Sequence, residues 1–418
     1  MVAAVPRMKR LVWSFALFAA LAASSTSDAI ILARTGDPNE NTTAPTNDPA
    51  GSGWNYEGQW DGFLGTPIAP NFFLAASHIG GSVGDSFTYA STTYTTVASF
   101  KDPFSDLIIW QINGTFPNYA PMYTKGDEIG QRIVAIGKGT QRGNELDVNG
   151  VLRGWYWGTP DGRQRWGENI VSDVVSLGTG FDTLYAIFDQ NGLANECHFS
   201  SGDSSGAVFI SDGGVWKLAG INYAVDGYFF TDAMGDGRFI AALFDVGGFY
   251  YSDESNPPNY TQIPEPTPTG FYDTRVSSKL AWIEGVIDPN GIANNDGIPN
   301  LLEYAKVLNG PRPQGYGVPT MSKGSTAVSL TYRMITGNSA LTYQVQQCSD
   351  MVSWGPATTQ DNVVSTNGNV QTVKSTVTLG QNQQQLFLRL QVTQSMGGQA
   401  ASVSIPVVRP AHAKENPR

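Results

Sequence analysis

Hydrophobic residues between positions 54 and 251 gather in short runs that are separated by Gly, Asp, Asn and Pro. Runs of about four to eight apolar residues with turn signals between them are typical of β-strands in a barrel or a sandwich. Representative runs are RIVAI (132–136), TLYAIF (183–188), AVFI (207–210) and WKLAGINY (216–223). This pattern predicts an all-β domain, to which we assign residues 30–251.

The composition of the chain changes at residues 252–270, which are rich in proline and polar residues and read SDESNPPNYTQIPEPTPTG. Proline removes backbone donors and favours extended, solvated chain, so this stretch predicts a semi-rigid linker. Hydrophobic residues then recur at helical spacing from Val276 to Ile287. Pro299 can open a second helix that is apolar on one side. We therefore expect a helical segment over residues 271–310.

The period of the pattern changes to two in the last part of the chain. Hydrophobic and polar residues alternate over 328–334 (VSLTYRM) and again over 386–392 (LFLRLQV). A period of two indicates strands with one buried face, as in antiparallel sheets. Residues 311–418 are therefore predicted to form a small β-sandwich.

The first 29 residues have the pattern of an export signal. Three basic residues among the first ten precede an apolar run from Leu11 to Ala23, which polar residues follow. That run is too short for a comfortable membrane span, and cleavage after Ala22, Ala23 or Ala29 satisfies the need for small residues. A retained N-terminal anchor is the alternative. We expect a secreted protein, placed outside the cell, in a periplasm or at a cell surface, with no membrane span in the mature chain.

The formal net charge is −11, and removal of residues 1–29 takes away three basic residues and one acidic residue, which gives −13. A charge of this sign argues against nucleic acid or anionic membranes as partners. The two cysteines, Cys197 and Cys348, fall in different predicted domains. The chain therefore lacks a disulfide framework, and its stability must come from its core.

Three short segments carry residues suited to nucleophilic chemistry. They are LAASH (74–78), SDLII (105–109) and SGDSSG (201–206). A serine hydroxyl becomes a good nucleophile when an imidazole takes its proton and a carboxylate holds that imidazole in the correct tautomer. Because the chain has three histidines, few residues can act as the base. We predict His78 as general base, Asp106 as its orienting carboxylate and Ser204 as nucleophile.

The flanking residues fit these roles. Small residues before His78 let an imidazole stand at a barrel mouth, and Asp106 stands at the head of an apolar strand. The turn at Gly202 can expose the Ser204 hydroxyl and aim backbone N–H groups at a developing oxyanion. Asp102 is a competing carboxylate, but Pro103 follows it and favours a loop there.

The three segments, in the order His, Asp, Ser, resemble those of the trypsin/chymotrypsin-type serine endopeptidases. The resemblance covers about residues 54–251 and implies two packed antiparallel β-barrels and hydrolysis of peptide bonds in a protein or peptide substrate. It also implies that the amides of Gly202 and Ser204 form the oxyanion hole. Asp203 would be structural, because in the family it pairs with a chain terminus or a substitute.

Three residues depart from the family pattern. Ser77 stands where Ala is usual, Ser205 where Gly is usual and Ala207 where Pro is common. None of them removes a catalytic atom, although Ser205 adds bulk beside the nucleophile. A catalytically silent barrel that acts as a binding or adhesion protein is therefore the alternative function.

Residues near the expected substrate pocket are His198, Tyr223 and Asp226. His198 lies six residues before Ser204, where the family places the floor of the primary pocket, so a protonated His198 would favour Glu or Asp in the substrate as pH falls toward about 6. His198 could instead pair with Asp226, and Asp226 could itself select basic residues. Tyr223 lies on the strand 220–224, which resembles the family's substrate-pairing strand.

The hydrolytic chemistry predicts no cofactor, but residues 288–303 resemble calcium loops of the dockerin and EF-hand type. The matching positions are Asn294, Asp296, Gly297, Asn300 and Glu303. Ile292 stands at the first loop position and has no side-chain oxygen, so a capped helix N-terminus is the alternative. The chain from about Phe271 also resembles a C-terminal module of exported bacterial proteins, with NLLEYA (300–305) and SDMVSW (349–354). That module implies contact with a cell surface or a glycan.

Overall fold

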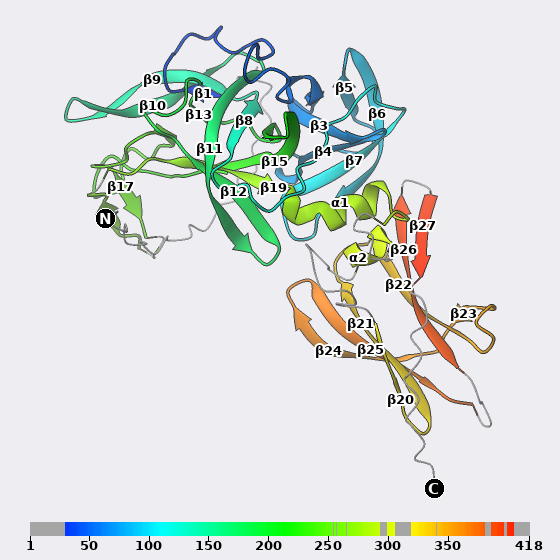
Figure 1. The fold of residues 1–418 in the computed structure, drawn as a ribbon. Helices are drawn as coiled ribbons and strands as arrows, with labels where there is room; N and C mark the ends of the chain where they lie inside the picture. Colours follow the sequence, from blue (N-terminus) through cyan, green and yellow to red (C-terminus); the bar gives the residue numbers. More distant parts are fainter. Residues whose placement is uncertain are drawn as a thin grey trace.

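The computed structural model describes residues 30–253, 255, 257–264, 266–292, 299–305, 319–339, 341–380, 386–396 and 399–404. Two closed, six-stranded antiparallel barrels form the upper part of the molecule in Figure 1. Two helices follow, and two four-stranded sheets form the lower part. The predicted all-β class is confirmed, with two barrels, a short helical segment and a small sandwich.

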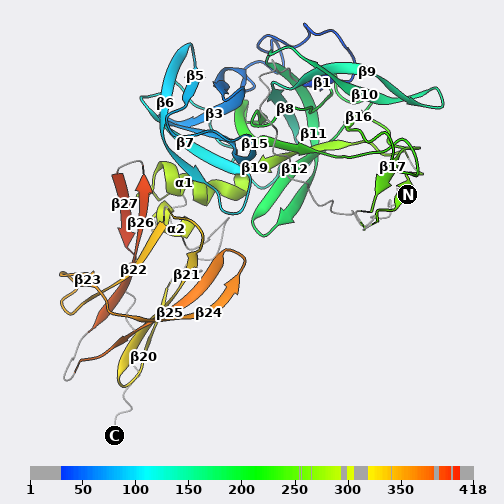
Figure 2. The ribbon, with the colours of Figure 1, turned by 180° about the vertical axis from the view of Figure 1, so that it is seen from behind.

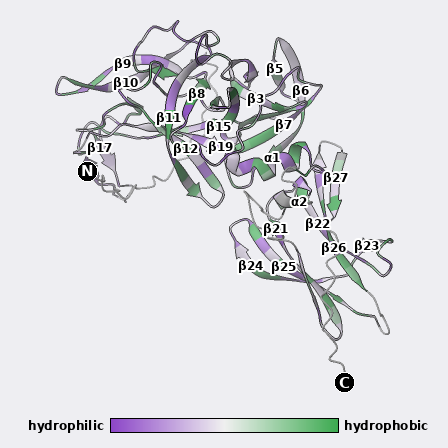
Figure 3. Cartoon of the chain, viewed as in Figure 1, coloured by the Kyte–Doolittle hydropathy of each residue, from purple (hydrophilic) through white to green (hydrophobic). Residues whose placement is uncertain are grey.

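The first barrel is built from the short apolar runs of the N-terminal half. Its strands, in hydrogen-bonded order, are β2 (Gly58–Trp60), β3 (Phe63–Ala69), β4 (Phe72–Ala76), β7 (Leu107–Asn113), β6 (Thr92–Lys101) and β5 (Ser86–Tyr89). An aromatic cluster fills its interior, where the Phe73 and Phe87 rings stack 3.9 Å apart. Hydrophobic residues along β7 are visible in Figure 3.

The second barrel extends beyond the predicted domain. Its strands, in order, are β11 (Arg165–Gly178), β12 (Phe181–Ile187), β19 (Gly270–Arg275), β15 (Val215–Val225), β14 (Ala207–Asp212) and β8 (Arg132–Gly137). Strand β19 pairs with β12 on one side and β15 on the other. The predicted boundary at Tyr251 is therefore wrong, because the barrel closes only with residues that lie after it.

The predicted linker over residues 252–270 is wrong as well. Strand β17 (Tyr250–Ser252) pairs with β18 (Tyr260–Gln262). Backbone bonds then tie Val246 to Thr267 at 2.9 Å and Thr269 to Leu243 at 2.8 Å. Prolines are tolerated here because each lies between paired positions. The described residues of this segment therefore pack against β16 and the chain that follows it, and they lead into β19.

Further small elements surround the barrels. They are β1 (Ile31–Leu32) paired with β13 (Cys197–His198), the sheet of β9 (Thr140–Val148), β10 (Val151–Pro160) and β16 (Ala241–Leu243), and the 3-10 turns η1 (Trp54–Tyr56), η2 (Ser77–Ile79) and η3 (Ser277–Lys279). Within the described residues, no helix is long and apolar enough to cross a membrane.

The sandwich has two sheets. One contains β20 (Thr320–Lys323), β21 (Ala327–Ile335), β25 (Val370–Thr378) and β24 (Gln360–Asn367), and the other contains β23 (Gly355–Pro356), β22 (Leu341–Cys348), β26 (Phe387–Met396) and β27 (Gln399–Ser404). Helices α1 (Leu280–Ile287) and α2 (Asn300–Ala305) lie between barrels and sandwich in both views (Figures 1 and 2). One apolar cluster runs from the barrels through both helices into the sandwich.

Candidate active site

The three residues predicted to act together are brought together where the two barrels meet. His78 lies in η2, directly after β4 of the first barrel, and Asp106 immediately precedes β7. Ser204 lies in the turn between β13 and β14 of the second barrel. Each of them follows or precedes a buried strand, so the barrel walls fix the backbone on which each side chain stands.

Hydrogen bonds connect the three side chains in series. His78 Nδ1 lies 2.5 Å from Asp106 Oδ2, and His78 Nε2 lies 2.8 Å from Ser204 Oγ. Because a carboxylate can only accept, Nδ1 carries the proton and Nε2 presents its lone pair to the serine hydroxyl. This tautomer is the one in which the imidazole can remove the serine proton.

The second oxygen of Asp106 fixes the turn that carries the histidine. Asp106 Oδ1 accepts the His78 amide at 2.9 Å, and the Asp106 carbonyl accepts the Ser77 amide at 2.7 Å. The Asp106 side chain is 11% exposed and that of His78 is 30% exposed. The carboxylate is thus shielded while the imidazole remains accessible to a substrate.

The turn around Ser204 is held from several sides. The Ser205 amide bonds to the Asn222 carbonyl at 3.0 Å, and Asn222 Nδ2 donates to the Asp203 carbonyl at 2.9 Å. Gly206 packs against the Ile136 carbonyl so closely that a Cβ would lie 2.1 Å from that oxygen. Only glycine fits there, and the close contact sets the position of the turn.

Two backbone amides of this turn are available to an oxyanion. Gly202 has φ 97°, a left-handed conformation that glycine adopts without strain. Within the described part of the chain, neither the Gly202 amide nor the Ser204 amide donates a hydrogen bond. Both predicted donors are therefore free to bind a negatively charged oxygen beside Ser204 Oγ.

The side chain of Ser205, which stands where the family usually has glycine, fits into the Ser204 turn without displacing it. Its φ is +67°, which explains why a glycine would serve at this position. Its hydroxyl is fully buried and accepts the Ala76 amide at 2.9 Å. The extra side chain thus links the Ser204 turn to the end of β4, and it points away from the nucleophile toward the first barrel.

Asp203 is buried and surrounded by donors. Its carboxylate accepts the amides of Ile30 (3.1 and 3.2 Å), Gly139 (2.8 Å) and Ser200 (2.7 Å). Burial raises the pKa of Asp203 to about 7, and the hydrogen bonds act in the opposite direction. Ile30 was not predicted to take part, although its position directly after Ala29, a possible cleavage site, was a signal for it.

His198 does not behave as predicted. It is fully buried, with Nδ1 2.7 Å from the Phe199 carbonyl and Nε2 3.2 Å from Thr269 Oγ1. Burial lowers the pKa of His198 to about 4. The expectation that His198 becomes charged near pH 6 is therefore wrong, because desolvation disfavours the imidazolium.

The other two predicted substrate contacts occupy different surroundings. The Tyr223 ring meets the His78 ring edge-on, with centroids 6.0 Å apart, so Tyr223 lies beside the series of catalytic candidates. Asp226 accepts the hydroxyls of Tyr185 at 2.6 Å and Tyr272 at 2.7 Å, and the Gly270 amide at 2.8 Å. These bonds tie β12, β15 and β19 together, and substrate contact by Asp226 stays a prediction.

The competing carboxylate, Asp102, is buried and paired with groups that hold its loop in place. It forms an ion pair of 2.6 Å with Lys279 of η3, and both side chains are 1% exposed. Ser105 Oγ donates to Asp102, and Lys279 Nζ donates to the Gly180 carbonyl. Lys279 thus fixes the 102–106 loop to the turn between β11 and β12, a role that sequence reasoning missed.

No group of three or more potential metal ligands occurs within the described residues. Of the predicted calcium loop, residues 294, 296 and 297 lie outside the described part, as does the side chain of Glu303. Asn300 is described, and its Nδ2 donates to the Asp288 carbonyl at 2.9 Å at the start of α2. Calcium binding stays a prediction.

The chain has few recognisable relatives in sequence and some in structure. No protein-family model matches the chain, and no curated protein matches it. Among solved structures, the chain is similar to the Rv3671c protease in its inactive form, with 16% identity and TM-score 0.29 over 53% of this chain and 82% of that one. The active form from M. tuberculosis gives 15% identity and TM-score 0.27 over 43% and 67%.

Proposed function

We propose that this protein is an exported serine endopeptidase. The observation that carries the proposal is the continuous series of contacts from Asp106 through His78 to Ser204, beside two unused backbone amides. Export is proposed from the basic and apolar pattern of the first residues. The substrate class is a polypeptide that can enter the site where the two barrels meet.

In this mechanism Ser204 Oγ attacks the carbonyl carbon of a peptide bond while His78 Nε2 takes the hydroxyl proton. A C–O bond forms, and the carbonyl oxygen becomes an oxyanion that the Gly202 and Ser204 amides bind. The C–N bond then breaks as His78 returns the proton to the leaving amine. Water, activated by the same imidazole, hydrolyses the acyl-enzyme and regenerates Ser204.

Each group in the site stabilises a different charge that forms during the reaction. Asp106 keeps the proton on Nδ1 and stabilises the imidazolium that forms during attack. The two amides stabilise the oxyanion, and loss of one such donor costs on the order of a hundredfold to a thousandfold in rate. His78 accepts the serine proton at Nε2 and later returns it to the leaving amine.

The test is labelling with a fluorophosphonate probe together with hydrolysis of peptide substrates. The wild-type protein should be labelled once, on Ser204, and should cleave peptides. Ser204→Ala and His78→Ala should both lose hydrolysis while their circular dichroism stays unchanged. Ser211→Ala, a matched change at an exposed serine on β14, should keep both properties. An unlabelled, folded wild-type protein would favour the silent binding barrel instead.

A further inference from the structure

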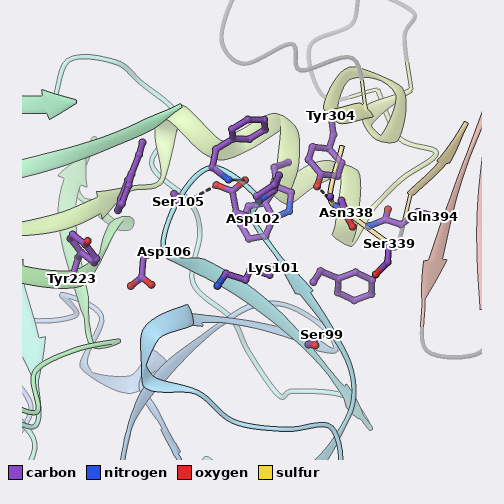
Figure 4. A pocket seen from close by; sticks show the side chains of 16 residues that line it. Ser99, Lys101, Asp102, Ser105, Asp106, Tyr223, Tyr304, Asn338, Ser339 and Gln394 are labelled. Carbon is purple, nitrogen blue, oxygen red and sulfur yellow. Dashed lines mark hydrogen bonds between the residues drawn. The ribbon is translucent and has the colours of Figure 1, made fainter. Parts of the chain in front are cut away.

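A pocket of about 480 Å³ joins the candidate active site to the C-terminal sandwich. Asp106 and Tyr223 line one end of it. Asn338, Ser339 and Gln394, all from the sandwich, line the other end (Figure 4). Binding sites of roughly 300–1,000 Å³ hold small ligands, so this volume suffices for a side chain with its adjoining backbone.

The pocket walls combine aromatic rings with few net charges. Phe104 and Phe181 form part of the wall, and Asp102, although acidic, is neutralised by Lys279 at 2.6 Å. Lys101 is exposed at the pocket and has no acidic partner within the described residues. The sandwich end offers only uncharged polar groups. Such a lining offers both donors and acceptors to a polar group.

Gln394 is the residue that points to a ligand. It lies on β26 opposite Leu341, on the face of the sheet that turns toward the apolar cluster. Its side chain is 1% exposed, and its Oε1 accepts no hydrogen bond from any described residue. Leaving a buried acceptor unpaired costs about 1–3 kcal/mol, so a donor supplied by a bound molecule would remove this cost.

We propose that this pocket binds an Asn or Gln side chain of the substrate polypeptide, several residues away from the cleaved bond. The inference rests on the proposed function. The carboxamide N–H group donates to Gln394 Oε1, and the carboxamide oxygen accepts from the Ser339 hydroxyl. Only a group that carries an N–H or O–H can pair with Gln394 Oε1 as it stands, so an aliphatic side chain leaves this oxygen unpaired.

This arrangement makes the sandwich part of the specificity of the enzyme. Tyr223, whose ring meets that of His78, lies at the near end of the pocket, so the chain of a substrate held at Ser204 can enter the pocket there. Its more distant residues reach the far end, which only the C-terminal part of the chain provides. Long substrates therefore gain a contact that short ones cannot make, and the gain appears in binding rather than in the chemical step.

The experiment uses the full-length protein and a series of long peptides in which each position on either side of the cleaved bond is Gln or Leu. We expect one distant position at which Gln raises kcat/KM about tenfold over Leu, through KM. Gln394→Met should abolish that preference. Gln391→Met, the same change three residues away on β26, should retain it. The inference is overturned if no position prefers Gln, or if Gln394→Met keeps the preference.

Two further measurements separate this inference from the proposed function. Fluorophosphonate labelling and hydrolysis of a single-residue ester should be equal in wild type and Gln394→Met, since neither needs the pocket. If the wild type is not labelled, the proposed function fails; if it is labelled but shows no Gln preference, only the pocket assignment fails. If Gln394→Met does not fold, Ser339→Ala takes its place and should weaken the same preference severalfold.

Discussion

The Asp106 carboxylate uses its two oxygens for different tasks, one on the imidazole and one on the turn that carries it. In Asp106→Asn an amide faces Nδ1 and favours the wrong imidazole tautomer. We expect kcat for peptide hydrolysis to fall by about three to four orders of magnitude. Asp102→Asn is the control and should change stability more than kcat. A larger loss of kcat in Asp102→Asn would show that Asp102 is the orienting group.

Ile30 indicates where the mature chain begins. Its amide donates to both oxygens of buried Asp203, and its φ of +42° is strained for a β-branched residue. Cleavage after Ala29 removes that torsion and places an ammonium group beside the carboxylate. We therefore predict that the proposed export cleavage leaves Ile30 as the N-terminus, to be checked by intact mass. A mature chain that begins at Ala23 or Ser24 would contradict this.

Glu57 should make stability fall with rising pH. Burial raises the pKa of Glu57 to about 8 from the ordinary 4.5, and one of its oxygens has no partner among the described residues. Between those values the unfolded chain has lost the proton and the folded one has kept it, so stability declines as pH rises. Glu57→Gln should match wild type near pH 4.5. At pH 8 it should be more stable by up to about 5 kcal/mol, as measured by denaturant unfolding.

At this scale the sequence predicted the residues whose neighbours along the chain define them. His78, Asp106 and Ser204 stand at strand ends that are visible as apolar runs. His198 was misjudged because its surroundings come from Thr269 and Phe271, about seventy positions later. Whether a histidine faces a pocket or a core depends on such distant contacts, which no local pattern contains.

At the scale of elements, the individual strands were predicted well, but the closure of the second barrel by β19 was not predicted. The apolar run at 207–210 lies in β14, and the alternating segment 328–334 lies in β21. Strand β19 follows a proline-rich loop, so its membership of the barrel depends on pairing with β12 and β15. The composition of residues 252–270 suggested a domain boundary because loops within a domain and linkers between domains are rich in the same residues, proline among them.

The closure of the second barrel by β19 leads to a prediction about fragments. A fragment of residues 30–251 leaves β12 and β15 without their shared partner, and we expect it to be unfolded and unlabelled by the fluorophosphonate probe. A fragment of residues 30–292 keeps β19 and α1, so its barrel can close and it should be labelled, but it should be less stable than the full chain because it lacks the sandwich side of the shared apolar cluster. Circular dichroism reports the folding of each. Labelling of the shorter fragment would show that β19 is dispensable for the site.

At the scale of the whole molecule, one apolar cluster joins the barrels to the sandwich, in addition to the separate clusters inside each barrel. Trp282 of α1 and Leu301 of α2 are buried in the same apolar cluster as Ile109 of the first barrel and Leu390 of the sandwich. Asn369 of the sandwich also donates to the Pro103 carbonyl at 3.0 Å, next to the loop that carries Asp106. The C-terminal part is therefore packed against the catalytic candidates, and it completes the pocket between them.

This shared core predicts that barrels and sandwich unfold together. We expect one calorimetric transition, whose van't Hoff and calorimetric enthalpies agree. Trp282→Ala removes a buried ring from the junction and should lower the free energy of unfolding by about 3–5 kcal/mol. Trp354→Ala is the matched control, because that ring is half-buried under Arg389 at the sandwich surface, and it should cost much less. Two separate transitions in the wild type, with Trp282→Ala shifting only one, would mean that the domains are independent.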